Sequence, residues 1–124
     1  MAKLSSNTPT RGGWSGTEGA TVVSGITVGA GNNTQALAVA LTGEVNVIGT
    51  SSATASTGVR LPGGVKAGDS VVVFNAGANT TLVYPAAGGK VDALSTNAGF
   101  SMATGKKAVF HAANATDWIA ILSA

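Results

Sequence analysis

The scarcity of large apolar side chains is the feature that most constrains how this chain can fold. Leu, Ile, Val and Phe together contribute 28 of the 124 residues, a share just above the level at which chains tend to be disordered. Small domains with so little core material are usually stabilised by disulfides, metals or other subunits. The sequence has no Cys and a single His, which leaves no route to a disulfide or an ordinary zinc site. We therefore expect a folded domain that is stabilised as a homo-oligomer and uses no metal or cofactor.

The residue types that are abundant favour strands and tight turns. Val is twice as frequent as Leu, Thr is common, and 18 residues are Gly; β-branched residues suit a pleated surface, whereas Gly and Asn suit turns. Apolar segments recur at a spacing of roughly 8–12 residues, which is typical of all-β domains. The strands expected from this pattern are 21–28, 44–48, 59–62, 70–75, 81–85, 90–94, 99–103, 106–111 and 117–122.

This pattern predicts an all-β fold for residues 21–124, as a single compact domain. We expect an antiparallel sandwich, or a jelly-roll or barrel-like arrangement. Residues 106–111 and 117–122 are expected to pair as a hairpin. Residues 35–42 alternate Ala with larger side chains, which favours a strand, but Ala and Leu also form helices well, so a short helix is the alternative there.

Residues 1–20 have a different character. They are polar and rich in Gly, with no strand or helix periodicity, and we expect an extended arm that becomes ordered against a partner. Trp14 is its one bulky side chain, and an indole in such a stretch is expected to dock on this subunit, a neighbouring copy or a larger partner. Lys3, Arg11 and Trp14 are the candidate partner-binding residues.

The charge pattern predicts neither nucleic-acid nor membrane binding. The net charge is +2, and the basic residues are scattered, except for Lys106-Lys107, whereas nucleic-acid-binding surfaces usually gather Lys and Arg into a patch. No apolar run approaches the length that crosses a bilayer. The first residues lack the apolar stretch of a secretory signal.

The sequence contains no recognisable catalytic constellation. General acid–base chemistry needs positioned carboxylates or a His, and an enzyme would have to bring together several of His111, Asp69, Asp92 and Asp117. Nothing in their spacing indicates this, so we do not expect an enzyme. Tyr84, which precedes Pro85, is expected to be partly exposed and would then stack on a sugar ring.

The second half of the chain resembles small β modules of tailed-bacteriophage virions, namely head decoration (cement) proteins and parts of head or tail fibres. The resemblance covers about residues 59–122. It is carried by Leu61-Pro62, by 71–77 (VVVFNAG), by 82–88 (LVYPAAG), by Ala93-Leu94 with Asn97, by Thr104-Gly105 and by Trp118-Ile119-Ala120.

The resemblance implies a structural role and transfers no catalytic residues. It implies a virion protein on the capsid surface, assembled in the host cytoplasm, that stabilises the capsid by bridging neighbouring major capsid subunits as a homotrimer. The alternative is a fibre or baseplate module that binds host carbohydrate, for which Tyr84 is the candidate stacking residue.

Overall fold

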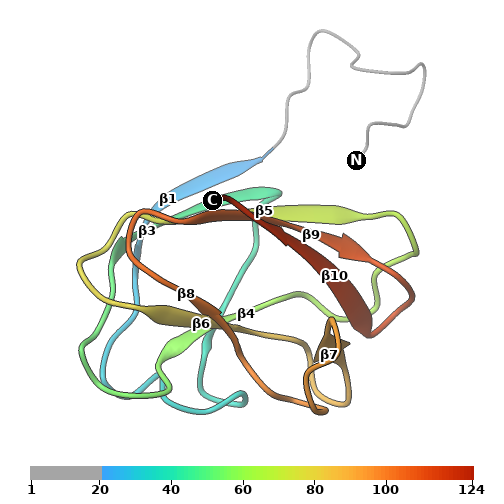
Figure 1. The fold of residues 1–124 in the computed structure, drawn as a ribbon, viewed down its shortest axis with the longest axis horizontal. Helices are drawn as coiled ribbons and strands as arrows, with labels where there is room; N and C mark the ends of the chain where they lie inside the picture. The colour runs from blue at the N-terminus through green and yellow to red at the C-terminus, as the bar shows by residue number, and fades with distance from the viewer. Residues whose placement is uncertain (1–20) are drawn as a thin grey trace, which may run out of the picture.

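A computed structural model describes residues 21–124, which form two facing β-sheets and no helix. The six-stranded sheet, whose strands β1, β3, β5 and β9 lie at the top of Figure 1, has the order β1-β3-β5-β9-β10-β7, and the four-stranded sheet has the order β2-β4-β6-β8. The strands are β1 (Val22–Thr27), β2 (Val39–Ala40), β3 (Val45–Thr50), β4 (Gly58–Arg60), β5 (Ser70–Asn75), β6 (Thr81–Tyr84), β7 (Lys90–Val91), β8 (Phe100–Met102), β9 (Lys107–Ala112) and β10 (Asp117–Leu122).

The all-β class is therefore confirmed, but the antiparallel sandwich, jelly-roll or barrel arrangement is wrong. From β1 to β6 the chain alternates between the two sheets, and each strand pairs in parallel with the next strand of its own sheet. The first six strands thus wind as a short β-solenoid. Val22 lies beside Val45, and Val45 beside Val72, so one turn of the coil takes 23 residues and the next takes 27.

The last part of the chain closes the structure with antiparallel strands. β8 runs antiparallel to β6, and β9 runs antiparallel to β5. β10 then pairs antiparallel with β9, which confirms the hairpin expected for this region. Residues 35–42 contain only the two-residue strand β2, and the alternative of a short helix there is wrong.

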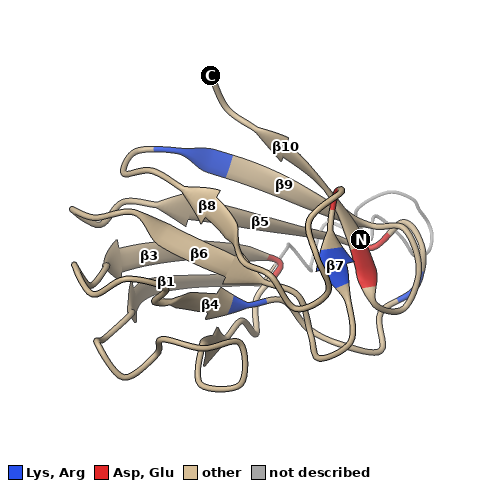
Figure 2. Ribbon diagram, turned by 60° about the horizontal axis from the view of Figure 1, so that its bottom comes forward, with Lys and Arg blue, Asp and Glu red and all other residues tan. Residues whose placement is uncertain are grey.

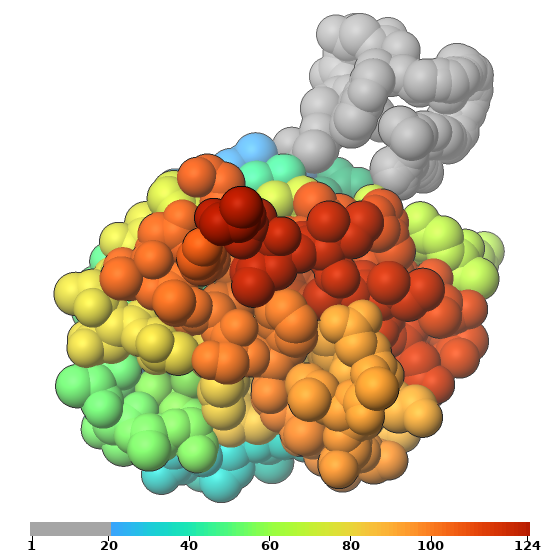
Figure 3. Space-filling model, viewed as in Figure 1, coloured from blue at the N-terminus to red at the C-terminus, as the bar shows by residue number. Residues whose placement is uncertain are grey.

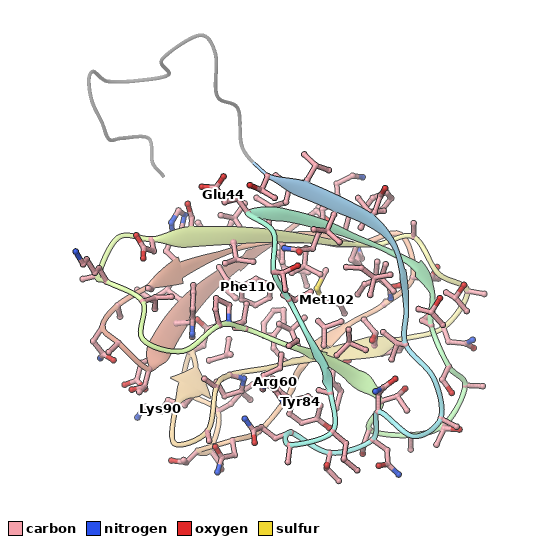
Figure 4. The ribbon with its side chains drawn as sticks, turned by 180° about the vertical axis from the view of Figure 1, so that it is seen from behind. Glu44, Arg60, Tyr84, Lys90, Met102 and Phe110 are labelled. Atoms are coloured by element: carbon pink, nitrogen blue, oxygen red, sulfur yellow. The ribbon has the colours of Figure 1, made fainter. Side chains whose placement is uncertain are left out.

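The core lies between the sheets and is small. Ile48, Val73 and Phe110 come from the six-stranded sheet, and Val59, Val83 and Met102 come from the four-stranded sheet; all six are fully buried. Figure 4 shows Phe110 and Met102 in the interior between the sheets. Phe110 meets Phe100 edge to face, with ring centroids 5.5 Å apart, a favourable aromatic geometry.

Buried amides hold successive turns of the coil together. Asn75 is fully buried, and its Nδ2 donates to the carbonyl oxygens of Asn79, at 2.9 Å, and Met102, at 3.0 Å. Its Oδ1 accepts from the Gly77 N–H. Ser51, in the turn after β3, makes three hydrogen bonds with Asn79, in the turn after β5. Since buried polar groups are costly unless paired, these contacts fix the stacking of the turns after β3 and β5.

Candidate functional site

Each carboxylate considered for catalysis is hydrogen-bonded to a backbone N–H or to a side chain of its own turn. Asp69 Oδ2 accepts from the Lys66 N–H at 3.0 Å, and Asp92 Oδ1 accepts from the Ala120 N–H at 2.9 Å. Asp117 bonds to side chains of its own turn. These are structural uses of a carboxylate, which satisfy backbone donors or brace a loop.

Residues 21–124 also lack a cluster of side chains suited to metal binding. Within residues 21–124, no group of three or more His, Asp or Glu side chains is placed to hold a metal ion. The same residues include no helix with the length and hydrophobicity to cross a bilayer. Charged residues are sparse and dispersed in Figure 2, and Figure 4 places Glu44, Arg60 and Lys90 apart from one another. The face in Figure 3 has no deep hollow.

Tyr84 does not have the exposure that sugar stacking requires, so the expectation of a partly exposed ring is wrong. Its side chain is 6% exposed, and its hydroxyl donates to the carbonyl oxygen of Ser56. Burial raises the pKa of the Tyr84 phenol above its ordinary value. The ring is covered because the loop after β3 folds back over the outside of the four-stranded sheet, which local sequence does not reveal. The other candidates, Lys3, Arg11 and Trp14, lie outside the described residues.

The outer face of the four-stranded sheet is covered by the chain's own loops. Arg60 points outward from β4, and its guanidinium donates to the carbonyl oxygens of Gln35 and Ala36, at 3.2 and 3.0 Å. Gln35 in turn donates to the carbonyl oxygen of Pro85 at 2.9 Å. These bonds tie the segment before β2 across β4 and β6, so the chain itself covers this part of the face.

The outer face of the six-stranded sheet is apolar instead. Strand pairing aligns one outward side chain from each of five neighbouring strands into a continuous line, which we call the aliphatic row: Val22 (β1), Val45 (β3), Val72 (β5), Val109 (β9) and Ile121 (β10). Val22 and Ile121, at its two ends, are 62% and 60% exposed. The three central valines are half-buried among their neighbours.

The residues beside the aliphatic row add to its apolar character. On one side, Val47 and Phe74 lie next to each other, and the Lys107 ammonium sits 4.4 Å from the centre of the Phe74 ring. On the other side, Ser70, His111 and Ile119 form the adjacent line. None of β1, β3 and β5 contains a charged residue. An antiparallel sheet with a solvated face normally places polar side chains there, so this face has the composition of a covered surface.

A second apolar area adjoins the row at the free edge of β10. β7 accompanies β10 only at Asp117 and Trp118, so β10 has a strand neighbour on one side alone from Ile119 onward. Leu122, 42% exposed, lies between two shallow apolar hollows: one includes Leu94 and Phe100, and the other lies against Val72, Val109 and Ile121. The edge and the row form one continuous apolar surface.

Comparison of the chain with protein-family models, curated proteins and solved structures finds no match. The aliphatic row was not identified by sequence reasoning, although one signal for it exists. Val71, Val72 and Val73 are apolar in succession, and such a run is typical of a strand covered on both faces. Which strands supply the rest of the row depends on parallel pairing between segments far apart in the chain.

Proposed function

We propose that this protein is a non-catalytic structural module of a bacteriophage virion, which decorates the capsid as a homotrimer and stabilises it by bridging neighbouring major capsid subunits. The observation that carries the self-association is the aliphatic row. An apolar sheet face of this kind costs free energy in water, at about 25 cal/mol per Å². Contact between copies removes that surface from solvent.

The distribution of polar groups supports a structural role. Asp69 and Asp92 accept backbone N–H groups, and Arg60 ties a loop to the sheet. The polar side chains of the described residues that make long-range bonds therefore brace the coil. The resemblance of residues 59–122 to decoration proteins supports the capsid as the site of action, and many copies with modest individual affinity would together bind strongly.

The alternative of a fibre or baseplate module that binds host carbohydrate has weaker support. It relied on an exposed Tyr84, whose ring is buried. Binding to a glycan array that persists in Tyr84→Phe and falls when Trp14 is replaced by Ala would favour this alternative.

The test uses the full chain and empty capsids of the virus that encodes it. We expect a trimeric mass in solution and saturable co-sedimentation with the capsids, at regular positions visible by electron microscopy. Removal of residues 2–16 should weaken capsid binding at least tenfold and leave the trimer intact. A trimer that never binds the capsids would contradict the capsid role. Full-strength binding by the truncated chain would contradict the role of Lys3, Arg11 and Trp14 in attachment.

A further inference from the structure

We infer that copies of this chain associate side by side in parallel through the aliphatic row, so that each side chain of the row meets the same residue in the neighbouring copies. This inference rests on the homo-oligomeric part of the proposed function and identifies the surface that makes the contact. The occupant of this face is thus a second copy of the chain.

The contrast between the two sheets is the first argument. Both sheets have an outer face, and the chain covers one of them itself, with Arg60 and Gln35 fixing the overlying loop. Within residues 21–124, no loop covers the aliphatic row, whose end residues Val22 and Ile121 are the two most exposed large apolar side chains. The face that lacks a cover carries only Val and Ile along its central line, with Ser70, His111 and Lys107 in the flanking lines.

The direction of the row is the second argument. Neighbouring strands are stacked along the axis of the coil, so a line of side chains that crosses five strands runs parallel to that axis. At about 4.8 Å between strands, the row extends over roughly 19 Å. An apolar line parallel to the coil axis fits a cyclic assembly, in which the symmetry axis runs along the row.

The absence of charge in the row is the third argument. In a parallel cyclic assembly every residue on the axis faces its own kind, so a charged side chain there would be repelled by its copies. All five positions of the row are Val or Ile. Lys107 and His111 belong to the flanking lines, and the Lys107 ammonium lies over the Phe74 ring. Glu44, which precedes Val45, accepts a hydrogen bond from the Thr21 N–H through its carboxylate.

The shape of the face is compatible with such a contact. Val72, Val109 and Ile121 line a shallow hollow together with Leu122, which gives a neighbouring row a place to insert its side chains. Apolar side chains of facing sheets normally interdigitate across about 10 Å.

The first experiment places a charge in the middle of the row. In Val72→Lys, identical ammonium groups would meet at the axis, and we expect the mass of the full chain in sedimentation to fall to that of one subunit. The matched control is Asn33→Lys, because Asn33 is exposed in the loop before β2, next to Asn32, which bonds to β4 of the opposite sheet; it should keep the oligomeric mass. Unchanged assembly of Val72→Lys would overturn the inference.

A second experiment does not depend on the stability of a separated subunit. The chain has no Cys, so single cysteines report contacts without background. Val22→Cys, treated with a bis-maleimide that reaches about 10 Å, the spacing of packed sheets, should give a covalent dimer in high yield, as should Ile121→Cys. Asn33→Cys should remain uncoupled.

The outcomes separate the arrangements. If Val22→Cys couples only when mixed with Ile121→Cys, the copies are antiparallel and the inference is wrong. If the full chain is a single subunit that associates only after removal of residues 2–16, the row is covered by the chain's own first residues, which also overturns it. An oligomer whose cysteines couple at Asn33 and not at Val22 would refute this interface and leave the proposed self-association standing. Coupling at Val22 without capsid binding would support this interface and contradict the proposed capsid role.

Discussion

Gly58 on β4 approaches the backbone of Leu82 on β6 so closely that a Cβ at Gly58 would lie 2.0 Å from the Leu82 carbonyl oxygen. The two residues are paired in the parallel ladder of the four-stranded sheet. The obstacle is backbone and not a mobile side chain, so the strands would have to separate to admit any other residue.

Gly58→Ala is therefore expected to lower the free energy of unfolding by about 3 kcal/mol or more, at or above the upper end of the usual cost of overpacking. Chemical denaturation followed by circular dichroism measures this. Gly31→Ala is the control, because a Cβ there meets nothing within 4 Å, and it should be neutral or stabilising by about 0.5 kcal/mol. Equal stability of the two variants would contradict the close approach.

Asn75→Asp tests the buried amide that joins the turn after β5 to β8. The carboxylate would keep the bond from the Gly77 N–H but would face the carbonyl oxygens of Asn79 and Met102, to which the amide now donates. Leaving an uncompensated buried charge typically costs about 3–5 kcal/mol. Asn75→Ala should cost less, about 1–3 kcal/mol, because it leaves unpaired groups without a charge.

The Asn75→Asp variant should also become dependent on pH. Burial raises the carboxyl pKa in the folded state above its value in the unfolded chain. Its folded state is then least destabilised at acidic pH, where the group is protonated, and loses stability as the pH rises through the raised pKa. Unfolding midpoints of this variant at pH 4 and pH 7, each referred to the parent chain, provide the measurement. A pH-independent difference would show that the side chain reaches solvent.

Tyr84 is expected to make the stability of the parent chain depend on pH in the alkaline range. Its pKa is raised by burial, and its hydroxyl donates to the Ser56 carbonyl. As the pH rises past about 10, the usual pKa of Tyr, the unfolded chain ionises first, and stability declines until the folded pKa is passed. Tyr84→Phe should cost about 1 kcal/mol at neutral pH and remove this part of the alkaline decline. If both chains lose stability equally above pH 10, Tyr84 is not responsible.

Trp118 offers a test of core packing. Its side chain is 2% exposed, and its indole Nε1 has no hydrogen-bond partner among the described residues. Trp118→Phe should cost less than about 1.5 kcal/mol, since removing an unpaired buried donor offsets part of the lost contact area. Trp118→Ala should cost about 3–5 kcal/mol. Thermal unfolding of the two variants checks the difference, and equally large losses would indicate that the N–H is satisfied in solution.

The positions of the strands could be predicted from the sequence, whereas their pairing could not. Segments such as Ser70–Asn75 and Asp117–Leu122 coincide with observed strands, because alternation and turn residues act locally. The sequence interpretation assumed antiparallel pairing, which holds for β9 with β10 but not for β1 with β3. The loop between β1 and β2 instead carries the chain to the opposite sheet, and its length permits either course. Parallel pairing of β1 with β3 follows only from that choice.

The candidate sites were less predictable than the fold. The position of Tyr84 before Pro85 marks the end of a strand, but the loop that buries the ring comes from the preceding coil and bonds at Ser56, 28 residues away. The aliphatic row is similar, since Val22 and Ile121 are at opposite ends of the described sequence. Their alignment requires four successive strand pairings, of which only the β9–β10 hairpin was indicated by the local sequence.

The winding of β1 to β6 has a consequence for how such a chain changes in length. Each turn contributes one strand to both sheets and, on the six-stranded side, one further Val at the outer surface, as Val22, Val45 and Val72 do. Duplication of a single turn would therefore lengthen both the buried core and the outer face that carries the aliphatic row by the width of one strand. Insertions within a loop would alter neither.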